Sequence, residues 1–315
     1  MQSRSLLLIA PRQLAWATEN LPPLQAHEVL VQTRAGAISS GTELPHYCAT
    51  ARSTEPPRYP RMTGYESVGI VSACGSDVQR LHVGERVVAF YGHRTRAIVP
   101  ENKALPIPDG ISDALALLAI LSCDAAKGIR KVAPAEDEPV LITGAGTMGL
   151  LTVFILTAYG VRAVDVVEPR AQRRELAVQL GARAALSPRE IASRSDFYPV
   201  GIECSSRSAA FELLQEKMQQ EGRICVLADG NIEPLVLAPA FHEKELSIAG
   251  SSDGWDYQEH ARWYFKVAQE HAYKLEQLFD YQTTARELIG TFAKLASDTI
   301  APTKVLIRYD AHFER

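Results

Sequence analysis

The sequence predicts an α/β protein in which a β-rich first domain precedes a doubly wound parallel sheet. Before residue 111, segments rich in β-branched residues alternate with loops, and no helical period exceeds two turns. After residue 139, six short apolar segments alternate with helical ones, the pattern of parallel strands joined by crossover helices. A chain of 315 residues is long enough for two domains with separate cores.

The first domain is expected over residues 1–115 and contains four candidate strands. These are EVLVQTRAGAIS (28–39), ESVGIVSA (66–73), ERVVAF (85–90) and HRTRAIVP (93–100). In the last of them, we expect His93 on the strand surface. A helix is expected over 111–131, where Ser112 or Asp113 is a suitable N-cap.

The second domain is expected over residues 116–253. Its candidate strands are 140–143, 163–168, 184–186, 200–204, 223–228 and 246–250. Phe211, Leu214 and Met218 recur at helical spacing and predict a helix over 208–222 that ends at Gly222.

The alternation stops after Gly250. Helices are expected over 256–279 and 284–297, followed by a closing strand over 304–310. Because this strand has no obvious partner in the parallel sheet, we expect it to return to the first domain. Residues 254–315 would then complete that domain.

Composition excludes several classes of protein. A net charge of -4 and a pI near 6.1 argue against binding to nucleic acid or a membrane surface, which favour a basic face. The five cysteines are scattered and contain no C-x-x-C, which fits reduced thiols in the cytoplasm. The longest apolar run, 148–161, is too short to span a bilayer.

The segment VLITGAGTMGLL has the G-x-G-x-x-G spacing of a dinucleotide-binding loop. A strand precedes it and an apolar helix follows. Gly144 is expected to make the tight turn, Gly146 to admit a pyrophosphate to the backbone, and Gly149 to let helix and strand pack closely. Thr147 and Met148 lie within the same cofactor loop. A glycine turn in some other α/β protein is the alternative interpretation.

Glu168 lies 19 residues after Gly149, at the end of the second strand of this unit. A carboxylate there can accept both ribose hydroxyls of NAD and repels a 2′-phosphate. Arg170, Arg173 and Arg174 follow directly, so NADP stays open, with Arg173 as the candidate contact. Alternatively, Glu168 is an ordinary surface charge.

Several motifs resemble the medium-chain dehydrogenase/reductase superfamily. GYESVGIV stands where the family has G-H-E-x-x-G-x-V, VGERVVAF matches its G-D-R-V strand, and IVPENKALPIPDG, GAGTMG and the closing KVLI complete the likeness. The resemblance implies a GroES-like catalytic domain, a Rossmann cofactor domain, an active site between them and a small-molecule substrate. It also implies a homodimer that pairs through the segment LSIAGSS.

The sequence departs from the family at the catalytic zinc site. Its SGTE segment puts Ser40 at the cysteine ligand, Thr42 at the hydroxyl residue and Glu43 at the acid, while Tyr65 replaces the histidine of G-H-E. Zinc prefers thiolate and imidazole donors, so the resemblance implies an enzyme without catalytic zinc. A metal held instead by Glu66, His46 or Cys123 is the alternative.

Without a Lewis acid, a carbonyl oxygen that gains charge needs hydrogen-bond donors. The resemblance places Thr42 at the substrate oxygen, Tyr65 and Ser40 in the former metal pocket, and His46 on a path to solvent. Tyr65 would donate a proton or hydrogen bond. The alternatives are that Thr42 caps a helix, that Tyr65 only fills space, and that Glu66 bonds to backbone or an arginine.

The predicted function is hydride transfer between NAD(P) and a secondary alcohol or ketone. Two alternatives remain open: a zinc-free, NADPH-dependent reductase of enones or quinones, and a non-catalytic nucleotide-binding protein of the same fold. The pairing SGTE…GYESVG is similar to that of a zinc-lacking relative, the dehydrogenase that oxidises the hydroxyethyl group of bacteriochlorophyllide. That similarity implies a bulky substrate.

Overall fold

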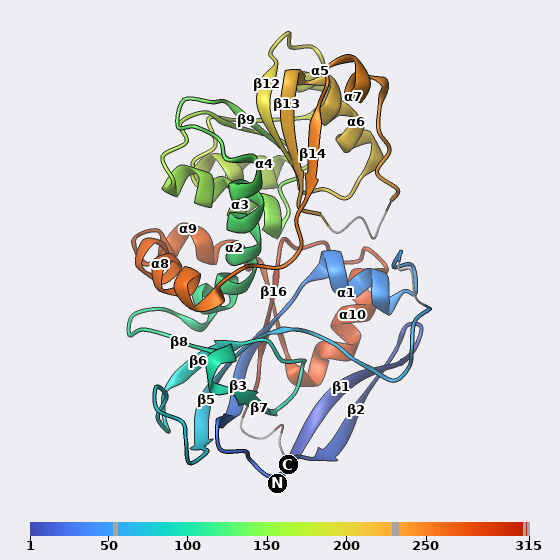
Figure 1. The fold of residues 1–315 in the computed structure, drawn as a ribbon. Helices are drawn as coiled ribbons and strands as arrows, with labels where there is room; N and C mark the ends of the chain where they lie inside the picture. The colour runs from blue at the N-terminus through green and yellow to red at the C-terminus, as the bar shows by residue number, and fades with distance from the viewer. Residues whose placement is uncertain (53–55, 229–232, 311–312, 314–315) are drawn as a thin grey trace. The chain divides into compact units, whose positions relative to one another are not determined.

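The computed structural model describes residues 1–52, 56–228, 233–310 and 313. It divides into two compact units (Figure 1). The first unit comprises Met1–Ile120, Tyr257–Ala272 and Leu278–Arg315, and the second comprises Leu121–Asp256 and Tyr273–Gln277. The boundary falls inside helix α2 (Asp113–Val132), so this helix begins in the first unit and ends in the second.

The first unit is built mainly from β-strands. Its strands are β1 (Gln2–Ala10), β2 (Gln13–Asn20), β3 (Glu28–Ile38), β4 (Arg61–Met62), β5 (Glu66–Cys74), β6 (Arg86–Ala89), β7 (Arg96–Pro100), β8 (Ala104–Pro106), β15 (Tyr281–Thr284) and β16 (Val305–Arg308). One sheet has the order β15-β16-β3-β5-β6-β8, with β7 also paired to β3, and a smaller sheet has the order β2-β1-β4. The four predicted strands are confirmed. The hairpin of β1 and β2 was not predicted, because the half-exposed QLAWATEN segment lacks a clear period of two.

The closing strand returns to the first unit, as predicted. Strand β16 pairs antiparallel with β3, from Val305 opposite Ile38 to Arg308 opposite Ala35. Beside this pair, helices α1 (Ser40–Tyr47) and α10 (Leu288–Ala296) pack against each other (Figure 1), with the rings of Tyr47 and Phe292 5.5 Å apart. Strand β5 pairs with β3 from Glu66 opposite Ala37, and Tyr65 directly precedes it.

The first unit has three further helical segments, η1 (Glu101–Lys103), α8 (Tyr257–Glu270) and η2 (Ala285–Glu287). Segment η1 was not predicted, whereas η2 and α10 together match the helix predicted over 284–297. The helix predicted over 256–279 is broken at His271, whose amide bonds to Ala268 only three residues back, and α9 (Ala272–Glu276) follows. At the start of α2, the amide of Leu115 donates to Ser112 Oγ at 3.2 Å, which confirms Ser112 as a cap.

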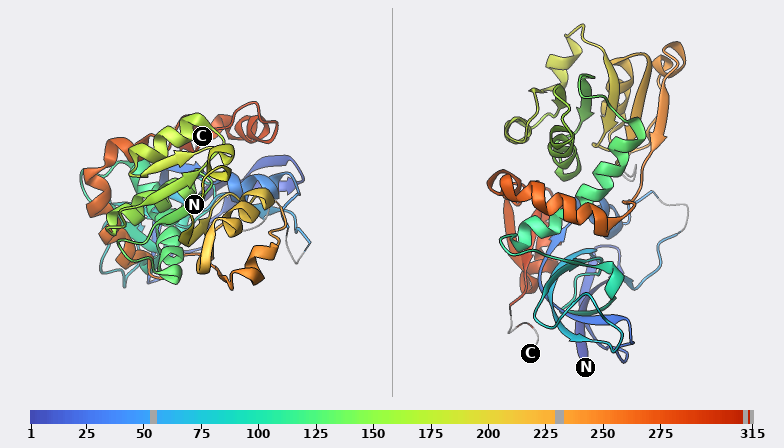
Figure 2. Two further views of the ribbon diagram at one scale, coloured as in Figure 1. Left: turned by 90° about the horizontal axis from the view of Figure 1, so that it is seen from above. Right: turned by 60° about the vertical axis from the view of Figure 1, so that its left-hand side comes forward.

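The second unit contains the predicted doubly wound sheet. Its six parallel strands are β9 (Val140–Thr143), β10 (Val164–Val167), β11 (Ala184–Leu186), β12 (Tyr198–Glu203), β13 (Met218–Val226) and β14 (Ser247–Gly250), in the order β11-β10-β9-β12-β13-β14. The helices around it are α3 (Thr147–Ala158), α4 (Ala171–Gln179), α5 (Pro188–Ala192), α6 (Ser208–Glu216) and α7 (Pro239–Glu243) (Figure 2). Within the described ranges, no helix is long and apolar enough to cross a membrane.

One helix prediction in this unit is wrong. Helix α6 ends at Glu216 rather than at Gly222, and strand β13 already begins at Met218. Met218 is fully buried in the sheet, where it lies opposite Tyr198. The apolar spacing that suggested one long helix therefore joins the buried face of a helix to the first buried residue of a strand.

Candidate functional site

The glycine loop of the second unit has a backbone that side chains would obstruct. Gly144 has φ +90°, and its amide donates to the carbonyl of Val167 at 2.8 Å. A Cβ on Gly149 would lie 1.9 Å from the Gly144 carbonyl oxygen, so helix α3 packs closer to the strand than any other residue permits. A Cβ on Gly146 would meet nothing within 4 Å, which leaves open space in front of the loop.

This open space lies at the amino-terminal end of α3. Gly146 is the N-cap residue and supplies no side-chain cap, and Gly146, Thr147 and Met148 are all half-buried. Backbone amides at a helix N-terminus attract anions through hydrogen bonding and the helix dipole. The loop therefore suits the pyrophosphate of a dinucleotide, which Gly144, Gly146, Thr147, Met148 and Gly149 would hold.

Glu168 follows β10 and faces the same loop. Its side chain is only 5% exposed: Oε2 accepts from the Ala145 amide at 2.8 Å and Oε1 from the Arg170 amide at 3.0 Å. A carboxylate oxygen can accept two hydrogen bonds, so both oxygens retain capacity for ribose hydroxyls. Glu168 is thus a buried residue that shapes the loop, and the surface-charge interpretation is wrong.

The arginines after Glu168 differ in their contacts. Arg174 Nη1 donates to the carbonyls of Glu168 at 2.8 Å and Pro169 at 2.7 Å, so its guanidinium stabilises the turn. Arg173 is half-buried in the first turn of α4. It is the residue predicted to contact the 2′-phosphate if the cofactor is NADP.

A second buried acid supports the glycine loop and was not predicted. Glu203, at the end of β12, accepts from the amides of Ser205 at 2.7 Å and Ser206 at 3.1 Å. A Cβ on Gly144 would lie 2.9 Å from Ser205 Cα, so this turn packs directly on the loop. The only sequence signal was a carboxylate at the end of a predicted strand.

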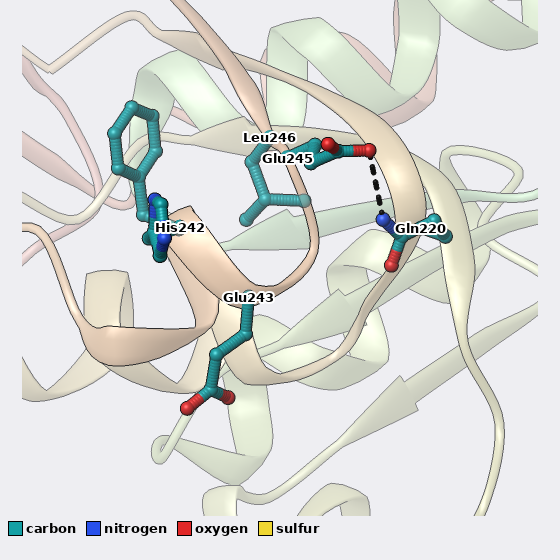
Figure 3. Close-up of a pocket in the computed structure, with 6 residues that line it drawn as sticks. Gln220, His242, Glu243, Glu245 and Leu246 are labelled. Atoms are coloured by element: carbon teal, nitrogen blue, oxygen red, sulfur yellow. Dashed lines mark hydrogen bonds between the residues drawn. The ribbon is translucent and has the colours of Figure 1, made fainter.

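A separate surface pocket of the second unit lies away from this loop (Figure 3). It is lined by Gln220, Phe241, His242, Glu243, Glu245 and Leu246, and Gln220 Nε2 donates to Glu245 Oε2 at 3.1 Å. These residues lie near the amino-terminal ends of β13 and β14, whereas the glycine loop follows the carboxyl end of β9. In open parallel sheets, ligands bind beyond the carboxyl ends of the strands. The pocket is therefore not the cofactor site.

In the first unit, Tyr65 directly precedes β5 and belongs to a hydrogen-bonded network. Its hydroxyl donates to Ser39 Oγ at 2.6 Å, and the side chain of Thr42 also bonds to the phenol. Burial raises the pKa of the Tyr65 phenol well above its usual value, and the nearby Glu66 carboxylate raises it further. The phenol is therefore protonated at neutral pH and can act as a donor.

Glu43 bonds to both segments that form the Tyr65–Ser39 hydrogen bond. Its Oε1 accepts from the Ser39 amide at 2.9 Å, while Oε2 accepts from the Gly64 amide at 2.9 Å and from His93 Nε2 at 2.9 Å. His93 is 0% exposed, so its predicted place on the strand surface is wrong. Backbone bonds to Thr63 and Leu6 hold the loop before β7 so that the imidazole points inward.

Glu66 forms a buried ion pair with Lys304. Both side chains are 0% exposed, and Lys304 Nζ lies 2.9 Å from Glu66 Oε1. Burial raises the pKa of the Glu66 carboxyl, and the Lys304 ammonium acts in the opposite direction. The structural role predicted for Glu66 thus has a lysine as its partner, not the backbone or an arginine.

The surroundings of four other predicted site residues differ from one another. Ser40 begins α1, and its buried Oγ bonds to no other described residue. Thr42 lies inside α1, whose N-cap is Ser39, so the cap interpretation of Thr42 is wrong. His46 Nδ1 accepts from Arg61 Nη1 at 2.9 Å, and burial raises the pKa of the Cys123 thiol in α2 to about 12.

The residues predicted to stand at the positions of the zinc ligands do not suit zinc. Tyr65 and Ser40 supply hydroxyls, and Lys304 neutralises Glu66. No three or more His, Cys, Asp or Glu side chains among the described residues are grouped to hold a metal ion.

Comparisons with known proteins agree with this architecture. Residues 25–109 match the alcohol dehydrogenase GroES-like domain. An L-threonine 3-dehydrogenase from Pectobacterium atrosepticum is 27% identical over 266 residues, covering 71% of this chain and 72% of that protein. The enzyme of the same name from Vibrio parahaemolyticus is 28% identical over 269 residues, covering 72% and 77%.

Solved structures share the fold over almost the whole chain. Galactitol-1-phosphate dehydrogenase from Escherichia coli superposes with a TM-score of 0.84 at 18% identity, covering 97% of this chain and 99% of its own. An alcohol dehydrogenase from Escherichia coli CFT073, complexed with NADH, gives 0.82 at 22% identity, covering 98% and 99%. These matches show an alcohol dehydrogenase GroES-like domain over residues 25–109 and a fold that solved dehydrogenases share over almost the whole chain. The matched relatives are named dehydrogenases, which argues against a non-catalytic role.

Proposed function

We propose that this chain is a zinc-independent oxidoreductase that transfers hydride between NAD(P) and a secondary alcohol or ketone. The observation that carries the proposal is the Tyr65 phenol, whose pKa burial raises and which donates to Ser39 at 2.6 Å where zinc-dependent relatives have a histidine ligand. The names of the curated relatives support the substrate class, because carbon 3 of L-threonine bears a secondary hydroxyl.

The chain's own groups would handle the oxygen of the substrate. When bound, the nicotinamide supplies or accepts the hydride. Tyr65 Oη has a single proton, which it donates to Ser39 in this structure; this proton would turn to the carbonyl oxygen as that oxygen gains charge, and the Ser39 hydroxyl would then donate to Tyr65 Oη. Ser39 and Thr42 hold the phenol in place, and Thr42 also lies near enough to Tyr65 to take part in moving the proton. We also propose that Ser40 lies beside the reacting oxygen, at the position of a metal ligand in zinc-dependent relatives, and that His46 leads toward solvent.

NAD is the proposed cofactor, and NADP is the alternative. Glu168 is already oriented by two amides and would accept ribose hydroxyls, whereas Arg173 would pair with a 2′-phosphate. Dissociation constants for NADH and NADPH, measured by quenching of tryptophan fluorescence, decide between them. Tighter binding of NADPH would overturn the assignment of NAD.

Zinc independence has its own test. Purified enzyme should contain far less than one zinc per chain by mass spectrometry, and incubation with 1,10-phenanthroline should leave turnover unchanged. Stoichiometric zinc, together with loss of turnover on chelation that zinc restores, would refute the proposal.

A reductase of activated C=C bonds is the second candidate, because a tyrosine donor without a Lewis acid also suits protonation of an enolate carbon. A panel of ketones and enones, including bulky aryl and macrocyclic ketones beside small ones, separates the two with NADH or NADPH. We expect turnover of ketones, with bulky ones preferred. Turnover of enones alone would replace the alcohol–ketone assignment.

A homodimer that pairs through β14 is part of the proposal. This strand is at the edge of the six-stranded sheet and offers backbone groups for pairing. Light scattering coupled to size exclusion should give twice the mass of 34.5 kDa; a monomer mass would contradict it.

A further inference from the structure

We propose that His93 is a positioning residue that acts through Glu43 to fix the hydrogen bond between Tyr65 and Ser39. This inference rests on the proposed function, in which Tyr65 is the donor to substrate. It assigns a role to a histidine that neither the motifs nor the proposed mechanism use. All four residues belong to the first unit.

The Glu43 carboxylate holds both partners of that bond by their backbone. Oε1 accepts from the amide of Ser39, whose side chain is the acceptor for Tyr65. Oε2 accepts from the amide of Gly64, the residue directly before Tyr65. One side chain thus aligns the turn before α1 with the turn before β5. A rotation of this carboxylate would shift Ser39 and Tyr65 relative to each other.

His93 fixes the orientation of the Glu43 carboxylate. Its Nε2 lies 2.9 Å from the same Oε2 that holds Gly64. The neighbouring acid Glu66 has Lys304 as its hydrogen-bonded partner, whereas the side chain of His93 bonds to Glu43. A charge-assisted hydrogen bond inside a protein is strong and directional, and it limits rotation of the carboxylate.

Backbone bonds and ring packing hold His93 in place, while its buried Nδ1 bonds to no other described residue. Its backbone amide donates to the Thr63 carbonyl at 2.7 Å, and its carbonyl accepts from the Leu6 amide at 2.8 Å. The ring packs edge-on to Phe292 with centroids 6.1 Å apart. A Cβ on Gly64 would lie 2.4 Å from His93 Nδ1, so the ring contacts the backbone beside Tyr65 directly. His93 therefore fixes the position of the turn before β5.

Two substitutions separate hydrogen bonding from volume. His93→Gln keeps an amide donor near the position of Nε2, whereas His93→Leu removes the donor at similar size. We expect His93→Leu to lower kcat for ketone reduction about 10-fold or more, with NAD(P)H affinity unchanged, and His93→Gln to keep kcat within about 3-fold of the parent. His260→Leu is the matched control, since His260 is also buried but packs among aromatic rings; its kcat should stay near the parent value. Equal losses for His93→Gln and His93→Leu would overturn the inference.

A double-mutant cycle tests whether the effect passes through the phenol. In the Tyr65→Phe background, His93→Leu should cause no further loss of kcat. Multiplicative losses would show that His93 acts elsewhere, and the inference would fail.

A readout that needs no turnover distinguishes this inference from the proposed function. With 3-fluorotyrosine incorporated, the Tyr65 resonance is identified by its absence in Tyr65→Phe. We expect that resonance to shift in His93→Leu and to stay in place in His93→Gln and His260→Leu. An unchanged resonance in His93→Leu would refute the positioning role. If it shifts while no ketone is ever reduced, the proposed function fails and the positioning role stands.

Discussion

The glycine loop of the second unit and the Tyr65 network of the first unit are built in opposite ways. The loop is formed by consecutive residues, and its shape follows from backbone conformations that only glycine allows, such as φ +90° at Gly144. The network joins side chains that are distant in sequence: Glu66 pairs with Lys304, 238 residues away, and His93 with Glu43, 50 residues away.

This difference determines how each region tolerates change. In the loop, an added methyl group is destabilising where it clashes with the backbone. In the network, removal of one polar partner matters because it leaves a buried group without compensation. In the loop, the effect of a substitution should therefore depend on whether the added atoms have room. In the network, it should depend on whether a buried polar group loses its partner.

The largest effect is expected from Lys304→Met. The change leaves the Glu66 carboxylate buried without its ammonium partner, which should lower the free energy of unfolding by about 3–5 kcal/mol. Urea denaturation measures this value. The double variant Glu66→Leu with Lys304→Met should recover most of the loss, because neither charge then remains buried. If the single and double variants are equally unstable, pairing does not govern this region.

Tyr65→Phe should leave folding nearly intact and act on chemistry. Loss of the donor should reduce kcat for ketone reduction about 100-fold, while the midpoint of thermal unfolding changes little. A deuterated nicotinamide donor would show whether hydride transfer limits the rate in both proteins. Unchanged kcat under that condition would mean that Tyr65 only fills space.

Within the loop, Gly149→Ala and Gly146→Ala should differ although the change is the same. The first places a methyl group 1.9 Å from the Gly144 carbonyl and should cost about 1–3 kcal/mol of stability as well as cofactor affinity. The second meets nothing within 4 Å in the protein, so stability should hold while NAD(P)H binds about 10-fold more weakly. Equal loss of stability in both would contradict the geometry.

The pH dependence should reflect the raised pKa of Tyr65. A phenol donates only below its pKa, and burial moves this pKa well above the usual 10.0, so the donor form extends further into the alkaline range. The rate of ketone reduction should therefore show no fall below pH 10 that is specific to Tyr65. Comparison of the profiles of the parent and Tyr65→Phe checks this, and a limb below pH 10 present only in the parent would oppose it.

The smallest effect is expected from Glu168→Gln. The neutral side chain keeps an oxygen for one of the two amides, so folding should persist, but the repulsion of a 2′-phosphate is removed. The ratio of NADPH to NADH affinity should rise several-fold by fluorescence titration. A constant ratio would mean that Glu168 shapes the loop without reading the ribose.

The sequence predicted what depends on local spacing. Hydrophobic periodicity and the placement of glycines were sufficient to predict the six parallel strands. The return of β16 to the first unit was predicted because this strand had no partner in that sheet. The network could not be predicted in the same way. Tyr65 was singled out by its motif, but nothing in the local sequence ties Glu43 to His93, and a single histidine in YGHRTRA carries no periodicity. The helix predicted over 208–222 failed for a related reason, since Met218 satisfied a helical spacing while packing as a strand residue.

The pairing of β16 with β3 also sets an order for biosynthesis. Strand β3 leaves the ribosome early, yet its neighbour β16 is made some 270 residues later, and Lys304 arrives with it. The continuous segment Leu121–Asp256 contains the whole parallel sheet and can acquire structure before β16 and Lys304 are synthesised. During that interval Glu66 has no ammonium partner and β3 has an open edge. The nascent chain is therefore most exposed to aggregation in the half that is synthesised first.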